Sequence, residues 1–330
     1  MNTHNSDSIT VRLIKDNDID GLIALYEEVW PDVDYDKKAK ANFVLKESNG
    51  INYCAEYNNK IVGSRTSFYI NAYIGSRKLR CIHIGDSCVT KECRGKGLFQ
   101  NMNKHLLADF FIDGDLIYNI SVAKSRISYE KLGWVYIKSL ESIFKILNPI
   151  RTLLKIKFDI RKLSGSRIWD KKQTIISIPQ NLIDERERIF REANLIHINY
   201  DLNTIAWRQK TYSGIKSFTT SSGLIIYKIG TIKNCGLTVV EIGEMFLSSY
   251  DKKCFKNALS EFVKNIKPDV IQTNVCHNHP LYKYYRRCNF INNPKHKYLH
   301  HGVRVNSDEM RELCLNPANW GISALDIDTF

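Results

Sequence analysis

The chain has 330 residues, enough for two domains of ordinary size, and 43% of them are hydrophobic, so buried cores are expected. It contains no run of 18 apolar residues and no basic and apolar leader at its start, so we expect neither a transmembrane helix nor a secretion signal. The nine cysteines are an odd number and show no pairing motif, which fits reduced thiols. We therefore expect a soluble, cytoplasmic protein.

The formal net charge of +13 is unevenly distributed along the chain. Residues 1–149 hold 20 Lys and Arg against 18 Asp and Glu, a net +2, whereas residues 150–330 hold 28 against 17, a net +11. Residues 150–172 alone hold eight basic and two acidic side chains among apolar ones. Three interpretations stay open for this stretch: a solvated linker, a surface for anionic membrane lipid or nucleotide phosphate, and a nucleic-acid surface.

The first half of the chain predicts alternating strands and helices. In chain order we expect a strand at 9–14, a helix over 16–30, a hairpin of 53–57 and 61–68, a strand at 78–89, a helix from 98, a strand at 116–123, a short helix at 128–132 and a last strand before 147.

Between the strand at 78–89 and the helix from 98 lies Arg94-Gly95-Lys96-Gly97. Glycines allow a positive φ and a close approach of the backbone to a ligand. The N–H groups of such a turn converge at the positive end of the following helix dipole, where they can hold phosphate. The two basic side chains strengthen the prediction of a phosphate-binding turn.

This turn resembles the pyrophosphate signature Arg-x-x-Gly-x-[Gly/Ala] of the GNAT acetyltransferase superfamily, which binds acetyl-CoA. The matching positions are Arg94, Gly97 and Phe99, and Phe99 departs from the small residue usual there. Downstream, Tyr129, Gly133 and Trp134 resemble the segment that ends the CoA site in that family. The resemblance implies a mixed, mostly antiparallel α/β fold, acetyl-CoA as the acyl donor, and donor contacts from Cys88, Val89, Arg94, Gly95, Lys96, Gly97, Leu98 and Phe99.

The second half predicts a degenerate repeat of the same fold. Two strands between 218 and 246, a helix at 253–264, a strand at 270–275 and a helix at 281–287 lead to Tyr285–Phe290, which aligns without gaps on Tyr129–Trp134. Acidic residues at 241–246 stand where a phosphate turn would be, so we expect one CoA site per chain. We expect a catalytic domain at 1–149, a basic linker at 150–172 and, at 173–330, a domain that shapes the acceptor pocket in the cleft between domains.

Two stretches, 203–208 and 319–328, resemble two-domain GNAT-like proteins of bacterial surface-polysaccharide gene clusters. That resemblance implies an amino sugar as the acceptor, held through a nucleotide diphosphate. Trp207 and Arg208 are candidates to stack on and pair with such an anionic ligand, and a purely structural role is equally open for them. The spacing of Cys276, His277 and His279 fits no zinc pattern, so no metal is expected.

The resemblance predicts an acyl-CoA-dependent N-acyltransferase, with acetyl as the default acyl group. The attacking amine must be neutral, and Asp86 is the first candidate for its base; His83, Glu56 and a chain of waters are alternatives. Tyr129 is the candidate donor of a proton to the departing thiolate, because a phenol stays protonated at neutral pH. Two other functions stay open: a Fem-type transferase that uses aminoacyl-tRNA, and a CoA-binding regulatory module without catalysis.

Overall fold

The computed structural model describes residues 9–31, 36–112, 114–159, 162–163, 166–172, 174, 176–200, 205, 214–293 and 297–327. Contacts divide the chain into two compact units, and neither unit is continuous in sequence. The first consists of Met1–Ile70, Arg80–Tyr136 and Gly302–Arg311; the second consists of Asn71–Leu79, Ile137–His301 and Glu312–Phe330.

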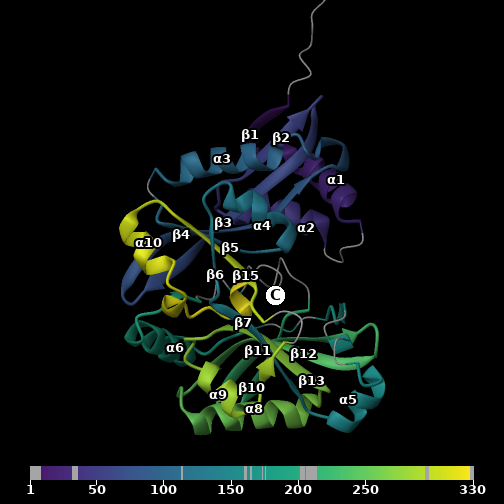
Figure 1. The fold of residues 1–330 in the computed structure, drawn as a ribbon, viewed down its shortest axis with the longest axis vertical. Helices are drawn as coiled ribbons and strands as arrows, with labels where there is room; N and C mark the ends of the chain where they lie inside the picture. Colours follow the sequence, from purple (N-terminus) through teal and green to yellow (C-terminus); the bar gives the residue numbers. More distant parts are fainter. Residues whose placement is uncertain are drawn as a thin grey trace, which may run out of the picture. The chain divides into compact units, whose positions relative to one another are not determined.

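The elements of the first unit follow the predicted order (Figure 1). They are β1 (Thr10–Leu13), α1 (Ile19–Val29), α2 (Lys37–Asn42), the π-helical turn η2 (Phe43–Glu47), β2 (Tyr53–Tyr57), β3 (Lys60–Ile74), β4 (Arg77–Val89), η3 (Lys91–Cys93), α3 (Leu98–Phe110), β5 (Leu116–Ser121), α4 (Ala123–Glu130) and β6 (Val135–Ile137). The sequence did not predict α2 and η2, and α4 begins five residues earlier than expected.

The first sheet has the strand order β1-β2-β3-β4-β5-β15-β6. The strand β15 (His300–Val305) comes from the far end of the sequence and lies between β5 and β6. Strands β4 and β5 are parallel, whereas β1–β2 and β2–β3 are antiparallel. Met102, Leu106 and Phe110 recur at every fourth position of α3 and are fully buried in the core that α3 forms with the sheet.

The second unit contains a sheet with the strand order β10-β11-β12-β13-β7-β14. Its elements are β7 (Leu140–Ile146), α5 (Pro149–Ile156), β8 (Arg167–Trp169), α6 (Gln180–Glu192), β9 (Ile196–Ile198), β10 (Lys216–Thr220), β11 (Gly223–Ile232), β12 (Leu237–Leu247), α8 (Lys252–Ile266), β13 (Val270–Cys276), α9 (Tyr282–Arg287), β14 (Ile291–Asn292), α10 (Asp308–Cys314, which begins in the first unit), η5 (Pro317–Asn319) and η6 (Ala324–Asp326). The strands and helices predicted between 218 and 287 are thus confirmed.

Each sheet includes strands from the other half of the sequence. In the first sheet β15 lies between β5 and β6 and β9 pairs with β3, and in the second sheet β7 lies between β13 and β14. The contact-based units therefore differ from the predicted domain bounds at residues 71–79, 137–149 and 302–311. The stretch 150–172 also contains α5 and β8, and β8 pairs with β11 in the second unit, so more than a linker lies there.

The second sheet repeats the arrangement of the first, as predicted. A parallel ladder joins Val239–Ile242 of β12 to Val270–Thr273 of β13, as a parallel ladder joins β4 to β5. The mixed, mostly antiparallel fold flanked by helices is confirmed. No helix in the described part of the chain is long and apolar enough to cross a membrane.

Candidate active site

The predicted phosphate turn links η3 to α3 in the first unit. Gly95 and Gly97 have φ of +78° and +75°, in the left-handed region that favours glycine. A Cβ built on either glycine would meet no atom within 4 Å, so open space adjoins both. Gly97 caps α3 without any side chain on the first N–H groups, and Arg94 and Lys96 are exposed beside it. The residues present therefore fit a pyrophosphate group.

Strands β4 and β5 diverge beside this turn. Their parallel ladder joins Cys81–His83 to Leu116–Tyr118, whereas β4 continues to Val89 and β5 to Ser121. Within the diverging part, Asp86 has a φ of +46°, which is uncommon for a residue other than glycine. Strained residues of this kind concentrate at functional sites. The parallel pairing of β4 with β5 therefore ends before the phosphate turn.

A buried arginine on β3 supports Gly85–Ser87 of β4, which we call the irregular part of β4 because Asp86 has a positive φ. The Nη1 atom of Arg65 donates to the carbonyl oxygen of Gly85 at 3.2 Å, and Thr66 Oγ1 donates to the same oxygen at 2.9 Å. Arg65 also donates to Ser87 Oγ, and its side chain is fully buried. The sequence analysis did not single out Arg65, although an arginine in the middle of the strand predicted at 61–68 is the signal that could have found it.

Asp86, the first candidate base, forms an ion pair with Lys40 of α2. The Lys40 side chain is 4% exposed and that of Asp86 is 24% exposed. The candidate base therefore has a buried cation as its direct neighbour. Sequence reasoning missed Lys40 because it lies in the polar run Lys37–Asn42, which reads as a solvated helix.

The two alternative bases lie in other surroundings. His83 is 1% exposed, and its ring packs 4.9 Å from that of Phe68 and 4.7 Å from that of Tyr118. Glu56 accepts from Arg12 Nε at 2.7 Å. Neither side chain lies in the irregular part of β4, so Asp86 stays the first candidate.

Tyr129 lies near the end of α4 and is 4% exposed. Its ring meets Phe99 of α3 edge-on at 5.0 Å and Trp134 at 5.1 Å, and the Arg65 guanidinium lies 5.8 Å from the ring centre. The structure thus brings the predicted proton donor together with the first turn of α3. Gly133, with a φ of +88°, ends this segment as predicted.

Cys88 and Val89 are the last two residues of β4, before the phosphate turn. Burial raises the pKa of the Cys88 thiol to about 12, and its Sγ lies 3.3 Å from Ser64 Oγ. A thiol with this pKa stays protonated at neutral pH, so Cys88 is no candidate for a covalent nucleophile. The carbonyl oxygen of Val89 accepts from Arg94 Nε at 3.2 Å, which holds the arginine against the strand end.

In the second unit, the places that correspond to the phosphate turn and to the diverging strands are filled by side chains and backbone of the chain itself. The helix that follows β12, α8, is capped by Asp251, whose carboxylate accepts from Cys254 N at 2.8 Å. Beside β13, the C-terminal segment pairs Ser323 with Val275, and Cys276 N donates to the carbonyl oxygen of Ile322 at 3.0 Å. An anion that approached the start of α8 would meet the Asp251 carboxylate, whereas the start of α3 adjoins open space.

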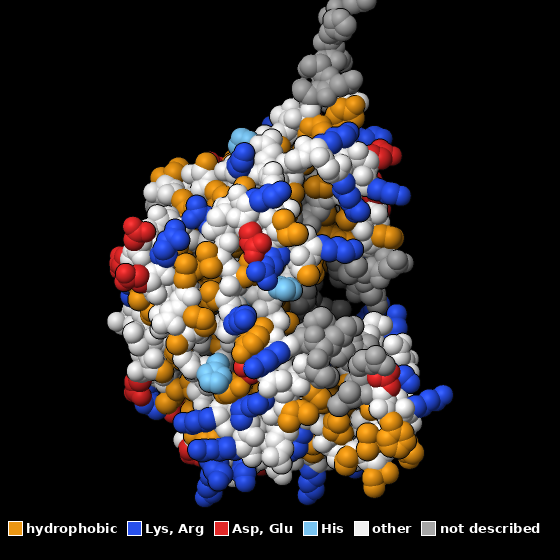
Figure 2. All heavy atoms as spheres, in the orientation of Figure 1, with side chains coloured by type: hydrophobic (Ala, Val, Ile, Leu, Met, Phe, Trp, Pro, Cys, Tyr) orange, Lys and Arg blue, Asp and Glu red, His pale blue; other side chains and the backbone are white. Residues whose placement is uncertain are grey.

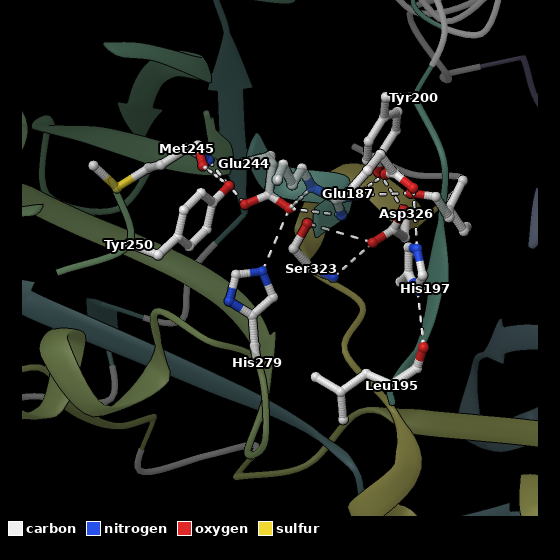
Figure 3. Close-up of polar contacts among 12 residues, drawn as sticks. Glu187, Leu195, His197, Tyr200, Glu244, Met245, Tyr250, His279, Ser323 and Asp326 are labelled. Atoms are coloured by element: carbon white, nitrogen blue, oxygen red, sulfur yellow. Dashed lines mark hydrogen bonds and ion pairs between the residues drawn. The ribbon is translucent and has the colours of Figure 1, made fainter. Parts of the chain in front are cut away.

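A buried cluster of charges lies in the second unit (Figure 3). Arg186, 1% exposed, donates to Glu244 at 3.1 Å and to Glu187 at 3.1 Å, and Glu244 also lies 3.4 Å from His279. Burial alone would raise the pKa of Glu244, but His279 and Arg186 outweigh it and lower this pKa to about 2. Because the charges satisfy one another, we interpret the cluster as structural.

The predicted acceptor contacts Trp207 and Arg208 lie outside the described residues. Among the residues that the structure describes, no group of three His, Cys, Asp or Glu side chains could hold a metal ion.

Comparison with known proteins identifies the first unit. Residues 10–137 match the family model of the acetyltransferase (GNAT) domain. This stretch is a GNAT domain. Its enzyme class is the acyl-CoA-dependent N-acyltransferases, so the predicted class is confirmed. No curated protein matches the sequence.

Solved structures share the fold over most of the chain. A GCN5-related N-acetyltransferase from Anabaena variabilis has a TM-score of 0.64 at 11% identity, covering 90% of this chain and 73% of its own. One from Kribbella flavida has a TM-score of 0.63 at 9% identity, covering 90% and 72%. Saccharomyces cerevisiae N-myristoyltransferase with bound myristoyl-CoA has a TM-score of 0.54 at 14% identity, covering 96% and 85%. The GNAT fold therefore extends beyond the matched domain.

Proposed function

We propose that the protein transfers an acetyl group from acetyl-CoA to the amine of an amino sugar in surface-polysaccharide synthesis. The observation that carries the acyl-CoA part is the turn at Arg94–Gly97, which opens onto free space at the start of α3. The amino sugar rests on the resemblance of 203–208 and 319–328 to proteins of polysaccharide gene clusters, and on the net charge of +11 in residues 150–330. A nucleotide-linked sugar would present a diphosphate to these basic groups.

The transfer requires one bond to form and one to break. The neutral amine attacks the thioester carbonyl, the new C–N bond forms, and the C–S bond breaks. In our proposal Asp86 takes the proton that the amine loses, and Tyr129 gives its proton to the CoA thiolate. Backbone N–H groups of the irregular part of β4 polarise the carbonyl, and the turn at 94–97 holds the pyrophosphate in position. Trp207 and Arg208 stay proposed contacts to the acceptor.

Release of free CoA thiol from acetyl-CoA tests this function directly. The full chain is supplied with a panel of free and nucleotide-linked amino sugars, and with simple amines as controls. We expect thiol release with a nucleotide-linked amino sugar, and binding of that sugar should weaken only modestly with salt. Steeply salt-dependent tRNA binding, with no amino sugar acetylated, would contradict the proposal and favour the Fem-type alternative.

A further inference from the structure

Helix α5 is fixed to the second unit along one side. Thr152 and Ile156 are fully buried, and Ile156 packs in a core cluster with Leu163. The Nε atom of Arg151 lies 3.2 Å from Asp269 Oδ1, and Lys155 Nζ donates to the carbonyl oxygen of Gly236 at 2.7 Å. These contacts hold the helix in one orientation on its unit.

Another side of the same helix is apolar and faces solvent. Ile150, Leu153 and Leu154 are 77%, 40% and 65% exposed, and Phe158, just past the helix end, is 76% exposed. We call these four side chains the α5 face. Hydrophobic side chains gather in Figure 2 where Figure 1 places α5. Helix positions 150, 153 and 154 share one side, so the exposure is continuous.

Phe158 has an unusual backbone conformation although its side chain is largely exposed. Lys157 and Phe158 both have positive φ, +51° and +60°, in the left-handed region that bulky residues rarely adopt. Core packing does not explain a phenylalanine at this position, since its ring is exposed. Contact of the ring with a partner outside the unit would explain why a phenylalanine stands at this exposed position.

We propose that the α5 face docks on the surface of an anionic lipid bilayer. The four apolar side chains would enter the boundary between headgroups and acyl chains, and the exposed Lys157, with the exposed part of Arg151, would lie among the anionic headgroups. Amphipathic helices with basic flanks bind membranes in this way. Residues 150–172 hold eight basic and two acidic side chains, so their charge is complementary to such a surface.

The size of the face favours a bilayer over a protein partner. Four side chains on about two turns of helix cover far less than the roughly 800 Å² that each partner contributes to a standard protein interface. A bilayer requires no matching pocket and accepts shallow insertion of a few apolar side chains beside basic ones. The docking does not depend on acyl transfer, so binding alone tests it.

Flotation of the full chain with vesicles tests the proposal. We expect the chain to float with vesicles of phosphatidylglycerol and phosphatidylcholine at low salt, less at high salt, and not with phosphatidylcholine alone. The triple variant Ile150→Ser/Leu154→Ser/Phe158→Ser should lower the partition coefficient about tenfold or more. Its melting temperature should stay unchanged or rise, because all three side chains are exposed.

Two further variants separate insertion from simple charge attraction. Ile112→Ser/Ile291→Ser removes apolar side chains that are 82% and 51% exposed elsewhere, and should leave vesicle binding intact. Lys157→Gln removes an exposed basic side chain and should weaken binding and reduce its salt dependence. The proposal is overturned if the wild type does not float with anionic vesicles or if the triple variant binds them equally well. It is also overturned if light scattering shows a dimer that the triple variant abolishes, which would make the α5 face a contact between two copies.

Discussion

The carboxylate of Asp86 pairs with the ammonium group of Lys40, whose side chain is 4% exposed. The pair joins the irregular part of β4 to α2, so the candidate base has a buried cation as its neighbour. The ammonium group is already protonated, so of the two groups only the Asp86 carboxylate can accept the proton that the acceptor amine gives up.

Asp86→Asn should lower kcat at saturating substrates by about 10²-fold or more, because general-base catalysis is worth that much. The loss should appear in steady-state thiol release, with acetyl-CoA binding near normal. Glu56→Gln, which removes a carboxylate paired with Arg12, is the matched control and should retain activity. Equal kcat for wild type and Asp86→Asn would leave the base to a water chain.

Lys40→Met should destabilise the first unit by about 2 kcal/mol or more, since it leaves a partly buried carboxylate without its cation. The double variant with Asp86→Asn should lose less stability than the sum of the two single variants. Denaturant unfolding measures both. Strict additivity would show that the pair contributes nothing to the fold.

The sequence predicted the parts of this site that are local in the chain. The turn at 94–97 and the turn at Gly133 that follows α4 depend on neighbouring residues, and glycine marks both. Arg65 and Lys40 could not be predicted in their roles, because burial of a charge depends on what other elements bring to it. The exchange of β7 and β15 was beyond prediction for a similar reason: which of several short apolar strands pair is decided by contacts distant in sequence.

Arg65→Lys should lower acetyl-CoA affinity and kcat together. Lysine cannot reproduce the guanidinium contacts to Gly85 O and Ser87 Oγ, so the irregular part of β4 should shift. Arg12→Lys, which alters an arginine paired with Asp18 on the same unit, is the control. Titration calorimetry and turnover measure the two effects, and an Arg65→Lys protein with wild-type values for both would remove this role.

Tyr129→Phe should reduce kcat by about tenfold or more while acetyl-CoA affinity changes little, because the ring contacts remain and only the donated proton is lost. Tyr136 is the matched control: its hydroxyl lies 2.7 Å from Ser121 Oγ, and burial raises its pKa to about 12. Should Tyr136→Phe lose turnover and Tyr129→Phe keep it, the proton donor would be Tyr136.

Acid should destabilise the second unit through His301. Burial lowers the pKa of His301 to about 3, so the folded chain keeps the ring neutral while the unfolded chain protonates it. Its share of stability is complete above the ordinary histidine pKa and is lost as the pH falls toward 3, about 3 kcal/mol between pH 7 and pH 4. His301→Asn should flatten this dependence in denaturant unfolding, whereas His277→Asn, with a side chain 65% exposed, should not.

The central claim is that the turn at Arg94–Gly97 holds acyl-CoA, and the thermal shift caused by acetyl-CoA tests it most directly. A ligand that binds only the folded state raises its melting temperature. Gly97→Asp puts a carboxylate into the open space at the start of α3. Gly236→Asp is the matched control, since Gly236 also has a positive φ, +62°, and open space around it, but lies in the second unit. We predict a shift for wild type and Gly236→Asp that Gly97→Asp abolishes; a full shift in Gly97→Asp would contradict the account.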